Sequence, residues 1–309
     1  PDNTYGVESG GDPENIPELS YEEFLNFHRT YYHPSNSYIY LYGNMDMEEK
    51  LRFIDEKYLS AFDALAVDSR ILEQAPFSQV KDLEEEYPVA ENEDEEDNTY
   101  LSFNMVVGNA MDSMLGVAFD VLDYALLSAP GAPLKKALLD AQIGKDIYGS
   151  YDDGVLQPFF SIVAKGAKTS QKEEFVSTIR KCLQDIVKNG VDKKAILAGI
   201  NYMEFRYREA DFGSYPKGLM YGLDILGNWL YDDENPFAQV KLLAIYDRLK
   251  EAVNEGYFEE IIRKWLLDNT HGTILTLIPK RGLAAKREKN LEEMLEKYRS
   301  SLSDAELEE

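Results

Sequence analysis

Histidine and cysteine are the side chains in this sequence that could hold a transition metal or act as a nucleophile. The chain has three histidines, His28, His33 and His271, and one cysteine, Cys182. Two helical histidines bind one zinc ion when they are four residues apart, because both imidazoles then leave the same face. His28 and His33 are five apart and Pro34 ends the helix, so we expect helix-end and packing roles for them. His271 is predicted to lie in a turn, and Cys182, among apolar residues, to be a buried, inert thiol.

The sequence lacks the common local motifs of catalysis and nucleotide binding. It has no Gly-x-Ser-x-Gly elbow, no P-loop and no dinucleotide-binding fingerprint. The acidic run 91–97 could bind calcium, but it lacks the glycine and the spaced oxygen ligands of an EF-hand, which favours a solvated linker. Arg206 and Arg208, beside several tyrosines, could hold a peptide carboxylate or could pair with neighbouring glutamates on a helix surface. We therefore predict no catalytic, metal-binding or cofactor-binding residue in this chain.

Composition limits the number of domains and the kind of partner. The 309 residues correspond to about two domains of ~100–200 residues, and 57 acidic against 32 basic residues give a net charge of −25. Such a surface repels nucleic acid and anionic membranes and attracts basic peptides or cations. No apolar run reaches the ~18 residues that span a membrane and no signal peptide is visible, which favours a soluble, cytoplasmic protein, although the compartment stays unknown. Because the chain begins at Pro1 in domain-like sequence, we expect a fragment of a longer protein.

The first 65 residues predict an incomplete unit of helices and one strand. Ser20 and Glu23 form a capping-box signature for a helix that runs to about Tyr31. Residues 37–42 are rich in aromatic side chains and predict a strand, and residues 47–62 predict an amphipathic helix. A single strand cannot satisfy its backbone hydrogen bonds, so this unit needs strands from elsewhere.

A second unit is predicted to begin near residue 98. Before it, prolines and the acidic run indicate a linker over 66–97, part of it extended. Strands are predicted at 99–107, 147–151, 156–165 and 273–278, and helices at 112–127, 133–142, 170–189, 192–210, 215–231, 236–252, 255–267 and 283–300. Asp152-Asp153-Gly154 is a hairpin turn signal between the second and third strands. Because strands and helices are partly segregated, we predict an α+β fold rather than a doubly wound sheet.

Three segments carry a family resemblance. They are Ser9-Gly-Gly-Asp-Pro13, Tyr32-His-Pro-Ser-Asn36 and Ser128-Ala-Pro-Gly-Ala-Pro133. In this order they resemble the insulinase (pitrilysin-type) zinc metallopeptidases, in the branch of the presequence proteases. The charged segment after Pro279 is similar to the start of the interdomain helical hairpin of that family, so the resemblance covers most of the chain.

The resemblance implies a fold and a set of domain boundaries. The fold is the α+β, LuxS/insulinase-like metallopeptidase domain, an antiparallel-rich sheet packed against helices, with one complete copy and the end of a preceding copy. Residues 1–65 would be the C-terminal part of the first, catalytic-type domain and 66–97 an acidic linker. Residues 98–282 would be a complete second, non-catalytic domain, and 283–309 the start of the charged helical hairpin.

The resemblance also implies an activity for the parent protein. Family members close around a peptide like a clamshell and bind zinc through a His-x-x-Glu-His motif and a distant glutamate in their first domain. At the position of the motif helix this chain has residues 114–124, which contain no histidine. We therefore expect zinc in the parent enzyme and none bound by this chain, with the zinc motif in sequence before Pro1. The expected role is the non-catalytic middle segment of a zinc metalloendopeptidase, and the expected partners are peptides, basic ones included, and the remaining domains of the same polypeptide.

A loop and a hairpin are the expected points of peptide contact. The resemblance and the hairpin pattern point to six residues that would form a chamber wall or an edge strand: Leu127, Ser128, Gly131, Ala132, Tyr148 and Tyr151. A catalytically inactive scaffold or interaction module of the same fold is the alternative.

Overall fold

The chain folds as two units in the computed structural model, which describes residues 3–13, 15–210 and 212–308. The first unit consists of residues 1–75, 154–156 and 205–242, and the second of residues 76–153, 157–204 and 243–309. These units divide the chain differently from the predicted domains in two places. Residues 76–97 join the second unit instead of forming part of a linker, and residues 205–242 join the first.

One five-stranded sheet organises the second unit. Its strands are β1 (Lys81–Val89), β2 (Thr99–Val106), β3 (Asp146–Asp152), β4 (Phe159–Ala167) and β5 (Gly272–Arg281), and their order is β1-β5-β2-β4-β3. β1 and β5 run parallel, whereas the β5–β2, β2–β4 and β4–β3 pairs are antiparallel. The predicted α+β fold with an antiparallel-rich sheet is confirmed, as is the β3–β4 hairpin.

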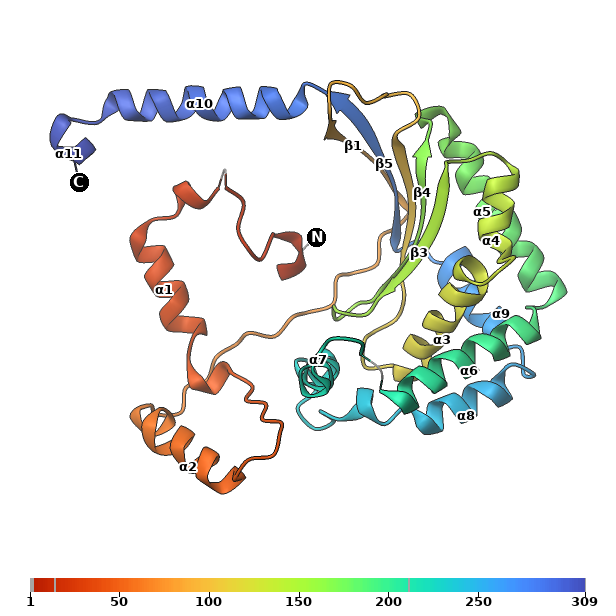
Figure 1. Ribbon diagram of the computed structural model, residues 1–309, viewed down its shortest axis with the longest axis horizontal. Helices are drawn as coiled ribbons and strands as arrows, with labels where there is room; N and C mark the ends of the chain where they lie inside the picture. Colours follow the sequence, from red (N-terminus) through yellow and green to blue (C-terminus); the bar gives the residue numbers. More distant parts are fainter. Residues whose placement is uncertain (1–2, 14, 211, 309) are drawn as a thin grey trace. The chain divides into compact units, whose positions relative to one another are not determined.

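Helices cover one face of this sheet (Figure 1). They include α3 (Ser113–Asp123), α4 (Pro133–Asp140), α5 (Lys172–Asn189), α6 (Lys193–Glu209), α8 (Leu243–Ala252) and α9 (Tyr257–Ile262). The core is at this helix-covered face, because alternate side chains of β2 (Leu101, Phe103 and Met105) are fully buried there. The intervening β2 side chains, Tyr100 to Val106, are only half-buried on the other face.

A long apolar helical stretch lies within this core. Residues Ser113–Asp140 join α3, a π-helical turn at Tyr124–Ser128 and α4. Among the described residues this is the one stretch whose length and composition alone would suit a membrane crossing. Its apolar character has a local explanation, since Phe119 and Leu122 on α3 and Leu134 on α4 are fully buried within the second unit.

Strand β1 is the extended part of the segment 66–97, for which the sequence predicted a linker and no paired strand. It pairs in parallel with β5 along its whole length, from Lys81 opposite Thr273 to Val89 opposite Arg281. The sequence pattern did not predict this strand, because Asp, Glu and Pro88 have low strand propensity. Charged residues and proline are tolerated on an edge strand, where most side chains stay exposed as they do here.

The acidic run 91–97 is also held more firmly than a solvated linker. Glu95 accepts a hydrogen bond from the backbone N–H of Arg281 at 2.6 Å. Lys168 lies 3.3 Å from Glu96 and 3.6 Å from Asp97. These contacts tie the connection between β1 and β2 to the rest of the second unit.

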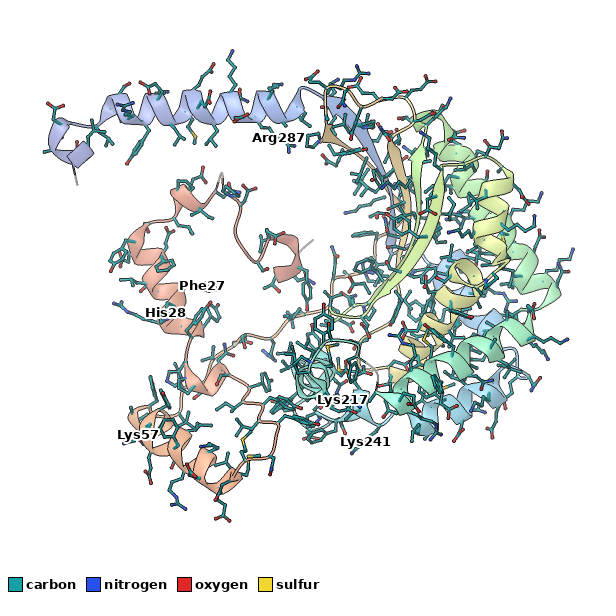
Figure 2. The ribbon with its side chains drawn as sticks, in the orientation of Figure 1. Phe27, His28, Lys57, Lys217, Lys241 and Arg287 are labelled. Atoms are coloured by element: carbon teal, nitrogen blue, oxygen red, sulfur yellow. The ribbon has the colours of Figure 1, made fainter. Side chains whose placement is uncertain are left out.

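The first unit contains helices without a sheet among its described residues. Its helices are α1 (Tyr21–Tyr31), α2 (Met47–Lys57) and α7 (Lys217–Trp229). The predicted capping box is confirmed, because the Ser20 hydroxyl accepts from the Glu23 N–H while Glu23 accepts from the Ser20 N–H at 2.9 Å. No residue of α1 is buried, and its Phe27 and His28, labelled in Figure 2, are exposed.

The strand predicted at residues 37–42 does not form. No described strand pairs with it, so its backbone cannot enter a ladder. Its aromatic side chains pack on α7 instead. A Cβ at Gly218 would lie 2.1 Å from the Tyr42 ring, and one at Gly222 would lie 2.8 Å from the Tyr40 ring. The two glycines, one turn apart, thus give the tyrosines a flat surface on α7.

Helix α10 (Leu283–Ser301) follows β5 as a charged, exposed element, in agreement with the helix predicted at 283–300. None of its residues is buried. Its apolar residues Leu291, Met294, Leu295 and Tyr298 are all about half-exposed. Their spacing of three or four residues puts them along one side of the helix.

Candidate functional site

Strand β3 forms one edge of the sheet and carries the residues of the predicted hairpin. Among the described residues β3 is the last strand of the sheet and pairs with β4 alone, from Asp146 opposite Lys165 to Asp152 opposite Phe159. An edge strand of this kind is a common template for strand addition. Tyr148 points away from the helix-covered face and is 43% exposed.

The π-helical turn after α3 packs directly on β3. A Cβ at Gly149 would lie 2.2 Å from Cδ1 of Leu127, 2.7 Å from Oδ1 of Asp123 and 3.0 Å from the carbonyl oxygen of Ser161. Real Cβ atoms do not make contacts this short, so the position requires glycine. Leu127 thus fixes the position of the edge strand from the helix side.

The six predicted contact residues fall into two groups. Ser128 is exposed, Tyr148 is exposed, and Gly131 has open space around its α-carbon. Leu127 and Ala132 are buried at 2% and 4% exposure, so they support the loop from below and present no side chain to a peptide. Tyr151 is also turned inward, with its ring 5.7 Å from the ring of Phe119.

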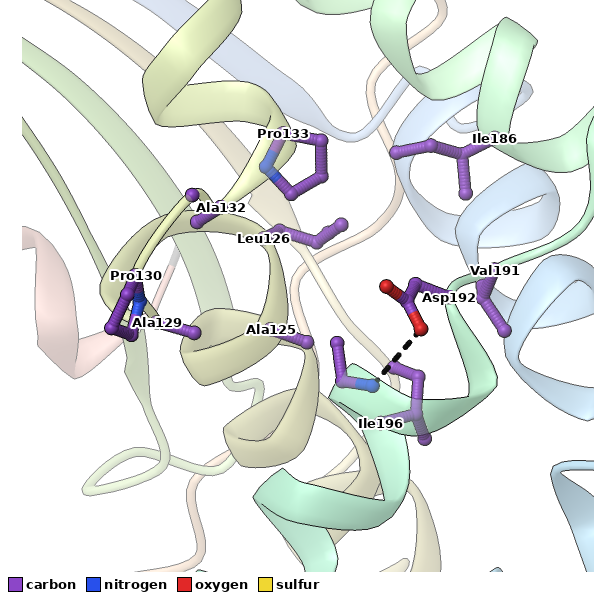
Figure 3. A pocket seen from close by; sticks show the side chains of 12 residues that line it. Ala125, Leu126, Ala129, Pro130, Ala132, Pro133, Ile186, Val191, Asp192 and Ile196 are labelled. Carbon is purple, nitrogen blue, oxygen red and sulfur yellow. Dashed lines mark hydrogen bonds between the residues drawn. The ribbon is translucent and has the colours of Figure 1, made fainter.

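A small pocket lies beside the loop that contains Gly131 (Figure 3). Its volume is about 100 Å³, and its walls are mostly alanine, proline and aliphatic side chains from the loop, α5 and the start of α6. Its one charged side chain, Asp192, accepts hydrogen bonds from the backbone N–H groups of Lys194 at 2.9 Å and Ala195 at 3.2 Å. Asp192 therefore caps α6. The rest of the pocket lining can make mainly apolar contacts with a ligand.

Three carboxylates that the sequence analysis did not propose as a site interact electrostatically near β3. Asp120 and Asp123 lie one turn apart on α3, and Asp153 follows β3; we call these three the carboxyl cluster. Burial, then the charges of Asp153 and Asp123, raise the pKa of Asp120 to about 7. Burial also raises the pKa of Asp123 and of Asp153. The available signal was two aspartates within an otherwise apolar helix.

Histidine and cysteine do not join a metal-binding group in the part of the chain that the structure describes. No group of three or more His, Cys, Asp or Glu side chains there could hold a metal ion. His28 stacks on Tyr32, and Nδ1 of His33 accepts from the N–H of Ser35. His271 directly precedes β5, is 5% exposed and packs against Phe77.

Cys182 on α5 is half-buried rather than fully buried. Burial, then the charge of Asp185, raises the pKa of its thiol. A thiol with a raised pKa is mostly protonated near neutral pH and is a weak nucleophile.

Comparison with known protein families identifies the family to which this chain belongs. Residues 18–203, more than half of the chain, match the family described as the peptidase M16 inactive domain. This chain belongs to the M16 inactive domain family. The membership confirms the predicted resemblance to insulinase-type peptidases.

Curated relatives of this M16 chain are longer proteins. Protein HypA from Clostridium perfringens is 44% identical over the whole chain, which covers 32% of that protein. Presequence protease 1 (chloroplastic/mitochondrial) from Arabidopsis thaliana is 35% identical over the whole chain, which covers 29% of it. The M16 chain therefore spans about a third of the length of these relatives.

Solved structures support the same fold. A putative M16-like peptidase from Alicyclobacillus acidocaldarius aligns with a TM-score of 0.62 at 17% identity, over 89% of this chain and 62% of that one. A chain of complex III from Candida albicans aligns with a TM-score of 0.65 at 12% identity, over 88% of this chain and 62% of that one. The fold thus occurs in a putative M16-like peptidase and in a chain of complex III, so it does not by itself specify an activity.

Proposed function

We propose that this M16 chain is the non-catalytic segment of a zinc-dependent metalloendopeptidase that degrades peptides in a closed chamber. In this proposal the chain forms part of the chamber wall, and β3 with the loop 127–133 contacts the peptide. The observation that carries it is the position of β3 at the open edge of the sheet, with Tyr148 exposed beside it. The chain would contribute no zinc ligand, because its described histidines and carboxylates do not form a ligand set.

Strand addition is the proposed mode of contact. An extended peptide that pairs with β3 gains main-chain hydrogen bonds whatever its sequence, which suits an enzyme that accepts many peptides. Ser128, Gly131 and Tyr148 are the predicted contact residues that support this proposal, since each is at the surface. Leu127 supports it indirectly by packing under Gly149.

The net charge of −25 favours basic peptides as substrates. Oppositely charged partners associate faster at low salt, and the advantage shrinks once the Debye length falls below about 10 Å. Cleavage of a basic peptide should therefore decline with added salt more than cleavage of an acidic peptide of the same length.

Other domains of the same polypeptide are the proposed partners of the first unit. A groove of about 1150 Å³ in this unit is lined by aromatic and aliphatic side chains of α1, α2 and the segments after them, among them Phe27, Tyr31, Ile39, Tyr58 and Phe62. Exposed apolar surface of this extent is characteristic of a face that packs against another protein surface. Relatives about three times as long as this chain are consistent with such a partner in the same polypeptide.

The test compares long and short peptides with the full-length protein that carries this chain. Gly131→Trp places a bulky side chain on the proposed contact loop and should lower kcat/KM for peptides of about 30 residues by about fivefold, roughly 1 kcal/mol. Cleavage of peptides too short to reach the loop should stay unchanged. Gly131 has φ of +78°, so Gly131→Asn is the matched control, because asparagine tolerates this conformation without the bulk.

Equal losses on long and short peptides would count against the contact role. The alternative function, an inactive scaffold of the same fold, rests on the absence of a metal-binding group in the described residues. It would be favoured if the full-length protein, supplied with zinc, cleaved no peptide of any length or charge.

A further inference from the structure

The sheet face opposite to the helices, which we call the outer face, carries a line of small polar side chains (Figure 1). Thr273 on β5 lies opposite Asn104 on β2, which lies opposite Ser161 on β4. Ser161 in turn lies opposite Ser150 on β3. Residues paired in this way share one face of a sheet. This face is the outer one, because Phe103, the neighbour of Asn104 along β2, is fully buried on the helix side.

Hydrogen bonds join Asn104 to three hydroxyl groups. We call Ser102, Asn104, Ser161 and Thr273 the hydroxyl cluster. Nδ2 of Asn104 donates to the Ser102 hydroxyl at 2.6 Å and to the Thr273 hydroxyl at 3.3 Å. The Ser161 hydroxyl donates to Oδ1 of Asn104 at 2.7 Å. Both N–H groups of the Asn104 amide are therefore used, and the amide is held in one orientation.

Two hydroxyl hydrogens of the hydroxyl cluster have no acceptor in the described part of the chain. Ser102 and Thr273 each accept from Asn104, so the hydrogen on each hydroxyl can be directed elsewhere. Both oxygens lie within hydrogen-bond distance of the same Nδ2, which brings the two donors close together. Both side chains are only half-buried. The pair is therefore suited to an acceptor oxygen that arrives from the outer face.

Apolar side chains surround the hydroxyl cluster on the outer face. Leu275 on β5 lies between Ser102 and Leu83. Val163 on β4 lies between Ser102 and Tyr148. Leu83 and Tyr148 are each 43% exposed. A few polar groups within apolar surroundings are typical of binding sites, and a peptide supplies both carbonyl oxygens and apolar side chains.

The charges on the outer face favour a neutral acceptor over a carboxylate. Lys81 and Lys165, whose positions put them on this face, lie over aromatic rings, 3.9 Å from the centre of Phe77 and 5.8 Å from that of Tyr100. The hydroxyl cluster itself contains no cation. The net charge of −25 repels anions in addition. A peptide carbonyl is a neutral acceptor and meets neither difficulty.

We propose that the hydroxyl cluster binds a main-chain carbonyl oxygen of a peptide, with Ser102 and Thr273 as the donors. This inference rests on the proposed function, because it takes a peptide as the ligand, and it adds a contact on the outer face to the one at the sheet edge. The line of polar side chains ends at Ser150 on β3, so the two contacts adjoin. Every residue of a peptide offers a carbonyl, so the hydroxyl cluster determines how tightly a long peptide is held rather than which sequence is chosen.

Equilibrium binding to the full-length protein that carries this chain tests the hydroxyl cluster. The probe is an uncharged, fluorescent, C-terminally amidated peptide of about 30 residues, which is long enough when extended to cross the sheet. Stopped-flow fluorescence anisotropy gives Kd before cleavage proceeds. Ser102→Ala combined with Thr273→Val removes both donors, and Kd should rise about tenfold, the loss expected for two hydrogen bonds. Should the double variant fold poorly, Thr273→Val alone should raise Kd about threefold.

Thr276→Val is the matched control. Thr276 is on the same strand as Thr273 but faces the helices, where it is fully buried and its hydroxyl has no partner among the described residues. This change should leave Kd as in the wild type. Thr273→Ser keeps the hydroxyl and should also bind the peptide as the wild type does.

An unchanged Kd in the double variant would overturn the inference. An equal rise in Thr276→Val would do the same, because the loss would then come from a disturbance of β5. A loss seen only with a free C-terminal carboxylate on the peptide would mean that the hydroxyl cluster binds an anion, which also contradicts the proposal. If Gly131→Trp weakens binding and the double variant does not, the edge contact of the proposed function stands and the hydroxyl cluster has no part in it. If neither changes Kd, both fail.

Discussion

The two edges of the sheet are built in opposite ways. β1 carries Asp82, Glu84, Glu85 and Glu86 and ends near Pro88, and two of these carboxylates are held by Lys172. β3 has glycine and serine at its centre, an exposed Tyr148, and the turn of α3 packed beneath it. Charge and proline oppose the pairing of a further strand with β1. β3 lacks these features in its central residues, and this contrast is the reason why we propose β3, rather than β1, as the edge that pairs with an extended peptide.

The largest effect on stability is expected from a substitution at Gly149, on the β3 edge. Gly149→Val adds a Cβ within 2.2 Å of Leu127 and 3.0 Å of the Ser161 carbonyl oxygen, so α3 or β3 must shift. We expect a loss of about 3 kcal/mol in the free energy of unfolding, measured by urea denaturation. Gly227→Ala on α7 is the control, because nothing lies within 4 Å of its Cβ position, and it should stabilise by ~0.5 kcal/mol. Wild-type stability in Gly149→Val would show that β3 is not fixed by this contact.

A smaller effect is expected at the β1 edge from Lys172→Met. Lys172 lies 2.7 Å from Asp82 and 3.0 Å from Glu84, and both carboxylates are more than half exposed. Exposed ion pairs contribute little, so β1 amides should exchange about threefold faster, or roughly 0.7 kcal/mol, at low salt. The difference should shrink in 1 M NaCl. Lys136→Met, which removes an exposed lysine paired with Asp140, should leave β1 exchange unchanged.

The smallest effect is expected from Pro88→Ala. Proline has no N–H, so its position on an edge strand implies that its nitrogen does not serve the ladder with β5. The free energy of unfolding should change by less than ~0.5 kcal/mol. The added N–H should slightly favour edge-to-edge association, which sedimentation at increasing protein concentration would detect. A large loss of stability would mean that Pro88 supports the β1–β5 pairing.

Local signals in the sequence identified much of the second unit. The turn at Asp152–Gly154 and the alternating pattern of residues 99–107 predicted the β3–β4 hairpin and β2 because their physics lies within a few residues. In the first unit, the Ser20–Glu23 capping box was predicted correctly for the same reason. The motif of residues 128–133 indicated the family, and the match over 18–203 confirmed it.

The candidate site was predicted only in part. The sequence indicated the loop and the hairpin but could not tell which side chains reach the surface. Leu127 and Tyr151 are turned inward by packing against Gly149 and Phe119, and these contacts join residues more than 20 positions apart. The carboxyl cluster was missed because the pKa of Asp120 depends on burial and on Asp153, which is distant in sequence.

By itself, the sequence determined the fold class, the helices, the hairpin and the family, since these depend on local periodicity, turn chemistry and short motifs. Tertiary structure decided that 81–89, though acidic, is a strand, because β5 supplies its ladder partner. It decided equally that 37–42, though rich in aromatic residues, is not a strand, because no described strand lies beside it and α7 takes up its tyrosines. A strand is defined by its partner rather than by its own residues, and the partner is known only once the chain has folded.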